Sequence, residues 1–296
     1  MFNIIGKRKI FLGISLLLVI ASIVSVAVFG FRQGIDFQGG SLWQINTKSD
    51  YSAEEVRVSL EEIGVEGVVV STASDGSFLV RFKEIGEDEH KNLKVATAEK
   101  LGEFKELSFQ SIGPTIGKEL RERALWAVFL VLFGISLYVA FAFRKVSFPV
   151  TSWKYGVVAL ITLFHDVIIP VGVLAWLGRL GGVEMDTNFV VALLVIAGFS
   201  VHDTIVVFDR TRENLKKGKG EQFSQIVNKS VNETLARSIN TSATLLFVLL
   251  ALYFAGPITL QFFILTILIG TLVGTYSSIC VASPLLVEWY EWGKGR

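Results

Sequence analysis

The stretch that decides the fold is Gly198-Phe199-Ser200-Val201-His202-Asp203-Thr204-Ile205-Val206-Val207-Phe208-Asp209-Arg210. It is the second half of an apolar run that starts near Phe189, and it ends in a charged segment. An aspartate at the centre of a membrane helix costs roughly 2.5–3.5 kcal/mol on insertion scales, so it normally faces a partner or a wet cavity. The sequence therefore predicts a membrane helix in which Asp203 meets a specific neighbour.

The composition of the whole chain indicates a membrane protein. Hydrophobic residues make up 51% of the 296 residues, charged residues make up 19%, and the mean hydropathy is +0.55. Water-soluble domains are usually about one quarter charged. The net charge of +1 argues neither for a nucleic-acid partner nor for an acidic one. The single cysteine, Cys280, lies in an apolar run and excludes both a disulfide within the chain and a thiolate metal site.

The first part of the chain divides into a membrane helix and a solvated domain. Residues 1–31 form a basic N-terminus and an expected first span over 10–31, long enough at about 1.5 Å per residue to cross a roughly 30 Å hydrocarbon core. Residues 32–123 hold 17 acidic and 12 basic residues and no long apolar run. Their pattern is strand, helix, strand, strand, helix, strand, with a capping-box sequence at Ser52-Ala53-Glu54-Glu55. Two βαβ-like halves of this size predict a ferredoxin-like α+β domain.

Residues 124–296 are expected to hold five further membrane helices, which makes six in all. Their expected ranges are 124–143, 155–177, 189–208, 239–255 and 258–287. Polar residues and Pro170 near the middle of the third span predict a break there. Residues 222–235 carry apolar side chains at helical spacing, which predicts an amphipathic helix at the membrane interface near 220–236.

The distribution of basic residues predicts the orientation. Fifteen Lys and Arg residues fall in the N-terminal segment, the second-to-third and fourth-to-fifth connections and the C-terminus, whereas the short loops on the other side hold only Arg179. By the positive-inside rule, both termini of this multi-pass protein are expected on the cytoplasmic side of the cytoplasmic membrane. The 32–123 domain is then extracytoplasmic.

Five polar residues inside or beside the predicted spans are candidates for proton coupling. His165 and Asp166 lie in the third span, His202 and Asp203 lie in the fourth, and Arg237 opens the fifth. A snorkelling arginine can reach back toward Asp203, and such an interaction would lower the cost of both charges. Two interpretations stay open: hydrogen bonds that only fix helix packing, and a carboxylate that loads and unloads a proton. Either histidine can join a proton relay or serve as a packing donor.

Other chemistry finds little support in the sequence. The two His-Asp pairs lack a third membrane histidine and a His-Glu-x-x-His motif, so a zinc site or an intramembrane protease is not expected. No phosphate-binding loop is present, which argues against ATP hydrolysis. We therefore expect a protein that is not an enzyme and has neither metal nor cofactor.

Several motifs along the chain resemble those of the SecF family, the smaller half of the SecD–SecF protein-export accessory complex. The resemblance covers essentially the whole length, and its motifs are strong together although each is weak alone. They are Gly34-Ile35-Asp36-Phe37-Gln38-Gly39-Gly40, Gly113-Pro114-Thr115-Ile116-Gly117, His165-Asp166-Val167, Asp203 to Arg210 with Arg212-Glu213-Asn214, Thr234-Leu235-Ala236-Arg237 and Gly274-Thr275-Tyr276-Ser277-Ser278.

The resemblance implies a proton-driven member of the RND superfamily. The family's intramembrane Asp and Arg, implicated in proton coupling, fall on Asp203 and Arg237. The expected partners are SecD, the SecYEG translocon, the exported unfolded polypeptide and the surrounding lipid, and the proton motive force takes the place of a cofactor. His202 stands where the family usually has Asn, and a histidine there can itself titrate.

Two points stay open at this stage. The motif residues Gly34, Asp36, Phe37, Gly39 and Gly40 either shape a turn, which the glycines favour, or contact polypeptide. The alternatives to an export subunit are an RND-like exporter of a small molecule or lipid, and a structural membrane subunit that transports nothing.

Overall fold

The computed structural model describes every residue except 49, 74, 145–149, 182, 219 and 295–296. The chain forms two compact units. One comprises Met1–Phe31, Trp126–Val183 and Asn188–Arg296, and the other comprises Arg32–Leu125 and Glu184–Thr187. Lys145, Lys219 and Arg296, three of the fifteen basic residues that predict the orientation, lie outside the described residues.

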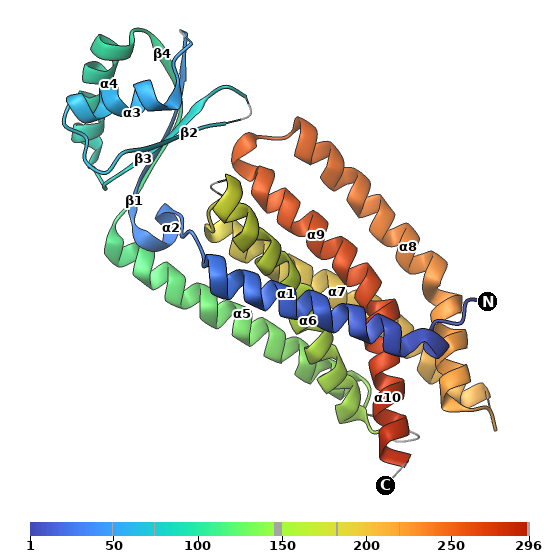
Figure 1. Ribbon diagram of the computed structural model, residues 1–296. Helices are drawn as coiled ribbons and strands as arrows, with labels where there is room; N and C mark the ends of the chain where they lie inside the picture. The colour runs from blue at the N-terminus through green and yellow to red at the C-terminus, as the bar shows by residue number, and fades with distance from the viewer. Residues whose placement is uncertain (49, 74, 145–149, 182, 219, 295–296) are drawn as a thin grey trace. The chain divides into compact units, whose positions relative to one another are not determined.

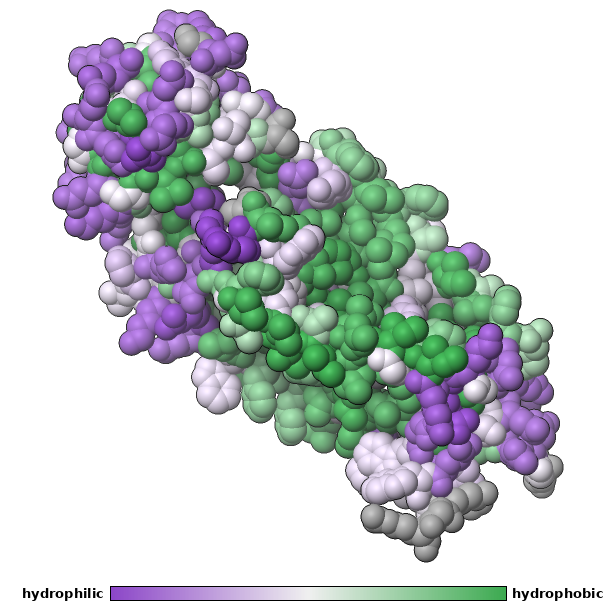
Figure 2. Space-filling model, in the orientation of Figure 1, coloured by the Kyte–Doolittle hydropathy of each residue, from purple (hydrophilic) through white to green (hydrophobic). Residues whose placement is uncertain are grey.

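Six helical segments among the described residues are long and apolar enough to cross a membrane, as the sequence predicts. Hydrophobic side chains dominate the visible surface of the helical unit in Figure 2, whereas the α/β unit is mainly hydrophilic. The helices are α1 (Arg8–Phe29), α5 (Pro114–Ala142), α6 (Ser152–Gly181), α7 (Thr187–Lys217), α8 (Phe223–Ala255) and, in the last span, α9 (Gln261–Ser277) followed by a π-helical segment (Ser278–Ala282) and α10 (Ser283–Lys294).

The predicted break in the third span is wrong. Helix α6 runs through Pro170 without interruption. A proline inside a helix removes the N–H that would bond to the carbonyl four residues earlier, here that of Asp166. Membrane helices tolerate such a proline because neighbouring groups and small local adjustments of the helix satisfy the freed carbonyl.

The predicted interfacial helix near 220–236 is not a separate element. It is the first half of α8, which continues into the fifth span without a break. Phe223, Ile226, Val227 and Val231 are buried, and three of these four join the main apolar core of the helical unit. Their apolar face therefore packs against protein, which explains the helical spacing without contact to a lipid surface.

The α/β unit confirms the predicted ferredoxin-like order. Its elements are α2 (Ile35–Gln38), β1 (Gly40–Thr47), α3 (Ala53–Glu62), β2 (Val69–Thr72), β3 (Phe78–Phe82), α4 (Glu87–Leu101) and β4 (Phe104–Ile112). The strands form an antiparallel sheet in the order β2-β3-β1-β4. Helices α3 and α4 cover one face of it (Figure 1), over a core that includes Trp43, Ile45 and Val80.

Local chemistry explains where α3 begins. The Ser52 side chain accepts a hydrogen bond from the Glu55 amide, and the Glu55 carboxylate accepts one from the Ser52 amide at 2.7 Å. This is the predicted capping box, and it satisfies two backbone donors at the helix start.

Candidate functional site

The helical unit contains a closed polar cluster around Asp166, at the middle of α6. Asp166 is fully buried, and its Oδ1 lies 2.8 Å from Nδ1 of His165. Its Oδ2 accepts hydrogen bonds from the hydroxyl of Ser277 on α9, at 2.7 Å, and from that of Ser200 on α7. Both carboxylate oxygens are therefore occupied, and one side chain joins three helices.

His165 has one nitrogen committed and one free. Nδ1 of His165 is committed to its hydrogen bond with Oδ1 of Asp166. Nε2 is buried and has no hydrogen-bond partner among the described residues. The ring of Tyr276 lies nearby, with 6.1 Å between ring centroids. The imidazole ring of His165 therefore uses one nitrogen in the cluster and leaves the other without a hydrogen bond to the described residues.

Two glycines of α9 allow this cluster to form. A Cβ atom at Gly274 would lie 3.2 Å from Cβ of Ser200, and one at Gly270 would lie 2.3 Å from Cδ1 of Ile196. The Gly-x-x-x-Gly face therefore packs closely on α7, as small residues permit. Ser277 follows on α9, directly before the π-helical segment.

Asp203 lies on the same helix as Ser200 but in a different environment. It is only 3% exposed, and its Oδ1 is 3.8 Å from Nδ1 of His202. Oδ2 is buried and has no hydrogen-bond partner among the residues that the structure describes. On α8 the hydroxyl of Ser242, which accepts a hydrogen bond from Thr275 at 2.6 Å, faces this carboxylate. Asp166 is thus fully paired, whereas Asp203 keeps an open acceptor.

The structure does not bring Arg237 and Asp203 together as an ion pair. Arg237 is exposed on α8 and makes no salt bridge within the described part of the chain. The side chain of His202 is 67% exposed, and Asn240 is also exposed on α8. Lipid tails cannot hydrogen-bond to such side chains, so we expect another protein or a water-filled cavity to cover this polar face of α7 and α8. The proton-coupling roles of the five predicted residues remain predictions.

A second candidate site lies in the α/β unit, at the predicted 34–40 motif. Asp36 accepts a hydrogen bond at 2.7 Å from the backbone N–H of Thr187, the first residue of α7. Gly34 donates to the carbonyl of Met185 at 2.8 Å, and Phe37 is buried. The motif therefore ties the chain before β1 to the loop between α6 and α7.

Two motifs that are far apart in the sequence meet at this site. Gly39 and Gly40 have φ angles of +81° and +127°, which side chains rarely adopt. A Cβ atom at Gly39 would lie 2.7 Å from Cα of Pro114, and one at Gly117 would lie 3.0 Å from the Gly39 nitrogen. Backbone thus packs directly on backbone. The positive φ angles and the close backbone contacts together explain why glycine is needed at these positions.

An ion pair supports the same loop. Nε of Arg81 on β3 lies 2.9 Å from Oε2 of Glu184. Burial raises the pKa of Glu184, and the positive charge of Arg81 partly offsets that rise. The described residues contain no group of three or more His, Cys, Asp or Glu that could hold a metal ion.

The sequence did not identify the partners of these acidic residues. Ser200, Ser277 and Thr187 each contribute a hydrogen bond that spans tens of residues or more in the sequence. The available signal was the recurrence of small polar residues inside apolar runs, which is common in membrane helices.

The family models and the relatives that match this chain agree on one family. Residues 92–292 match the family model for the protein export membrane protein SecD/SecF, C-terminal, and residues 24–49 match the model for the SecD/SecF GG motif. The protein translocase subunit SecF of Thermobaculum terrenum is 46% identical over 98% of this chain and 94% of its own. The protein translocase subunit SecDF of Thermus thermophilus is 37% identical over 100% of this chain and 39% of its own.

Solved structures agree with this comparison. The crystal structure of SecDF from Thermus thermophilus, described as a translocon-associated membrane protein, matches with a TM-score of 0.86 and 36% identity. The match covers 100% of this chain and 39% of that longer chain. A second structure, SecDF in its super-membrane-facing form, matches with a TM-score of 0.70 over 99% of this chain and 39% of that one.

Proposed function

The chain belongs to the SecD/SecF family of protein-export membrane proteins, and on this premise we propose that it uses proton movement at Asp203 to promote polypeptide export. Its role in the Sec protein translocation machinery is that of the SecF subunit. The coupling step needs no metal and no organic cofactor, because the proton gradient supplies the free energy. The electrical part of that gradient is worth about 2.3 kcal/mol per charge per 100 mV.

The observation that carries the proposal is the contrast between the two buried aspartates. Asp166 has both oxygens paired, so it is built to hold helices together. Asp203 has a buried Oδ2 without a partner among the described residues. A buried oxygen of this kind is satisfied when the carboxyl takes up a proton or meets a donor that moves. Asp203 is therefore the residue suited to load and release a proton.

The exposed polar face on α7 and α8 supports SecD as the partner. His202, Arg237 and Asn240 lie on membrane-spanning helices and are open to the surroundings of this chain. SecD and SecF form one longer chain in the Thermus relative. We place SecD on this face, where polar side chains of its helices satisfy these groups and bring a counter-charge near Arg237. The SecYEG translocon and the unfolded polypeptide complete the assembly.

The orientation follows from the basic residues. Both termini lie on the cytoplasmic side of the cytoplasmic membrane, and the α/β unit lies outside. A reporter enzyme fused after Asp75 should be active only outside, and one fused after Lys217 only inside. The reverse pattern would overturn the orientation.

The function is tested by translocation of a precursor into vesicles that contain this chain, SecD and the translocon. We expect an imposed proton gradient to stimulate translocation with the native chain and not with Asp203→Asn or Arg237→Met. Asp209→Asn is the matched control, because Asp209 lies on the same helix with an exposed side chain paired to Arg212. Full stimulation in both variants would favour a structural subunit, and a chain that works without SecD would favour an independent RND-like exporter.

A further inference from the structure

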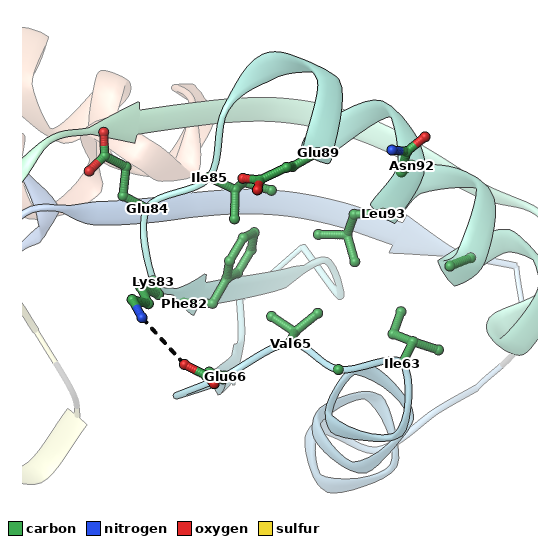
Figure 3. A pocket seen from close by; sticks show the side chains of 12 residues that line it. Ile63, Val65, Glu66, Phe82, Lys83, Glu84, Ile85, Glu89, Asn92 and Leu93 are labelled. Carbon is green, nitrogen blue, oxygen red and sulfur yellow. Dashed lines mark hydrogen bonds and ion pairs between the residues drawn. The ribbon is translucent and has the colours of Figure 1, made fainter.

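The α/β unit contains a pocket of about 490 Å³ that the coupling mechanism does not use. It lies between the loop that follows α3, the end of β3 and the first half of α4. Figure 3 shows the apolar side chains around it: Phe82, buried in the sheet, together with Val65, Ile85 and Leu93. A volume in this range accommodates a small ligand or one large apolar side chain with neighbouring atoms.

The rim of the pocket is acidic. Glu66, Glu84 and Glu89 lie around it together with a single cation, Lys83, which is 3.4 Å from Glu66. The Glu89 carboxylate is used to cap α4. Such a rim favours a positively charged neighbour and disfavours the phosphate or carboxylate of a lipid.

Two polar side chains at the rim remain free to bind. Glu84 and Asn92 are exposed and form no hydrogen bond or ion pair with the residues that the structure describes. A side-chain amide both donates and accepts, as a peptide backbone does, and a carboxylate pairs with Lys or Arg. The pocket therefore combines an apolar lining with Asn92, which can hydrogen-bond to a peptide backbone, and Glu84, which can pair with a Lys or Arg side chain.

We propose that this pocket binds an extended segment of polypeptide, with one large apolar side chain over Phe82 and a flanking Lys or Arg at Glu84. Asn92 pairs with the backbone of the segment. The occupant is the unfolded chain in export, because such a chain exposes apolar side chains and unpaired backbone groups that folded proteins bury. This inference rests on the proposed function and assigns its substrate contact.

Crosslinking in the assembled translocase tests the location. A photoreactive amino acid is placed at Ala96, which lines the pocket, or at Val95, which is 63% exposed on the same helix and does not line it. With a precursor arrested in transit, we expect crosslinks to the precursor from position 96 and few from position 95. Equal yields at both positions, or crosslinks from position 96 to lipid alone, would overturn the proposal.

Peptide binding to the full chain in nanodiscs tests the chemistry. A labelled extended peptide with one Leu flanked by lysines should bind, and Ala96→Trp, which fills the pocket, should weaken its Kd roughly tenfold. Val95→Trp should leave the Kd unchanged, and both variants should melt at the native temperature. Glu84→Gln should weaken the Lys-flanked peptide and not one flanked by glutamine.

The outcomes separate this proposal from the one on which it rests. If Asp203→Asn abolishes stimulation by the gradient while Ala96→Trp leaves peptide binding intact, the pocket proposal fails and the coupling proposal stands. If peptide binding and crosslinking follow the pocket while Asp203→Asn exports normally, the pocket stands and the coupling proposal fails.

Discussion

Replacing Asp166 by alanine should destabilise the helical unit far more than its single position suggests. The substitution removes the acceptor for His165, Ser200 and Ser277 at once, and all three of these side chains are buried. Two of the lost hydrogen bonds connect different helices. The helices α6, α7 and α9 would then be held together here by packing alone.

The size of the effect follows from the number and kind of contacts. Interhelical hydrogen bonds in membranes average about 0.6 kcal/mol and reach about 1.7 kcal/mol. A buried donor left without a partner costs about 1–3 kcal/mol. Ser277 also donates to the carbonyl of Gly274 at 3.0 Å, so its hydroxyl keeps one acceptor. We therefore expect the free energy of unfolding to fall by about 2–4 kcal/mol in Asp166→Ala and by about 1 kcal/mol in Ser277→Ala.

The assay is equilibrium unfolding in mixed micelles, followed by tryptophan fluorescence as the denaturing detergent increases. Thr162→Val is the matched control, because the hydroxyl of Thr162 is buried in the same helix and donates to the carbonyl of Val158, within that helix, at 2.8 Å. If Asp166→Ala loses no more stability than Thr162→Val, Asp166 does not join the helices and the reasoning fails.

Three further predictions use other contacts. Gly270→Leu should cost about 1–3 kcal/mol by overpacking against Ile196. Gly134→Leu should cost less, because no described atom outside its own stretch of helix lies within 4 Å of the place that its Cβ atom would take. Mixed-micelle unfolding measures both, and equal effects would contradict the close contact of α9 and α7. Asp36→Ala should accelerate hydrogen exchange at the Thr187 amide without changing exchange in the β-sheet, because the Asp36 side chain accepts a hydrogen bond from that amide. Unchanged exchange at Thr187 would show that this hydrogen bond does not hold the loop. Burial opposes ionisation of Glu106, but hydrogen bonds from Trp43 and Lys94 hold its pKa below the ordinary value of 4.5. The stability that the ionised Glu106 contributes is complete above pH 4.5 and is lost as the pH falls below that value. Glu106→Gln should therefore make the melting temperature fall less steeply with decreasing pH than it does in the native chain. Equally steep declines in the two proteins would contradict this role.

Several elements could be predicted from the sequence because their causes are local. Long apolar runs predict the six spans, since a helix pairs its own backbone groups in lipid. Ser52 and Glu55 predict the start of α3 through contacts three residues apart, and the alternation of Phe78, Val80 and Phe82 predicts β3. The order of strands and helices along the chain then predicts the ferredoxin-like sheet.

Two expectations failed where local pattern and tertiary packing compete. The apolar positions of residues 222–235 are those of an interfacial helix, but the same face is buried by the protein's own core. Pro170 and the polar pair before it are typical of a helix break, but α6 continues through all three residues. The polar pair is accommodated there because the Asp166 side chain finds donors on α7 and α9.

By itself, the sequence determined which segments enter the membrane, which segment folds outside them and where the costly acidic side chains lie. Only the tertiary structure decided that Asp166 is saturated while Asp203 keeps an open oxygen, and that Arg237 is not its ion-pair partner within the described part of this chain. The reason is physical: hydropathy and periodicity are properties of consecutive residues, whereas a hydrogen-bond partner depends on the offset and spacing of whole helices. Those are set by close contacts such as Gly270 on Ile196 and Gly274 on Ser200.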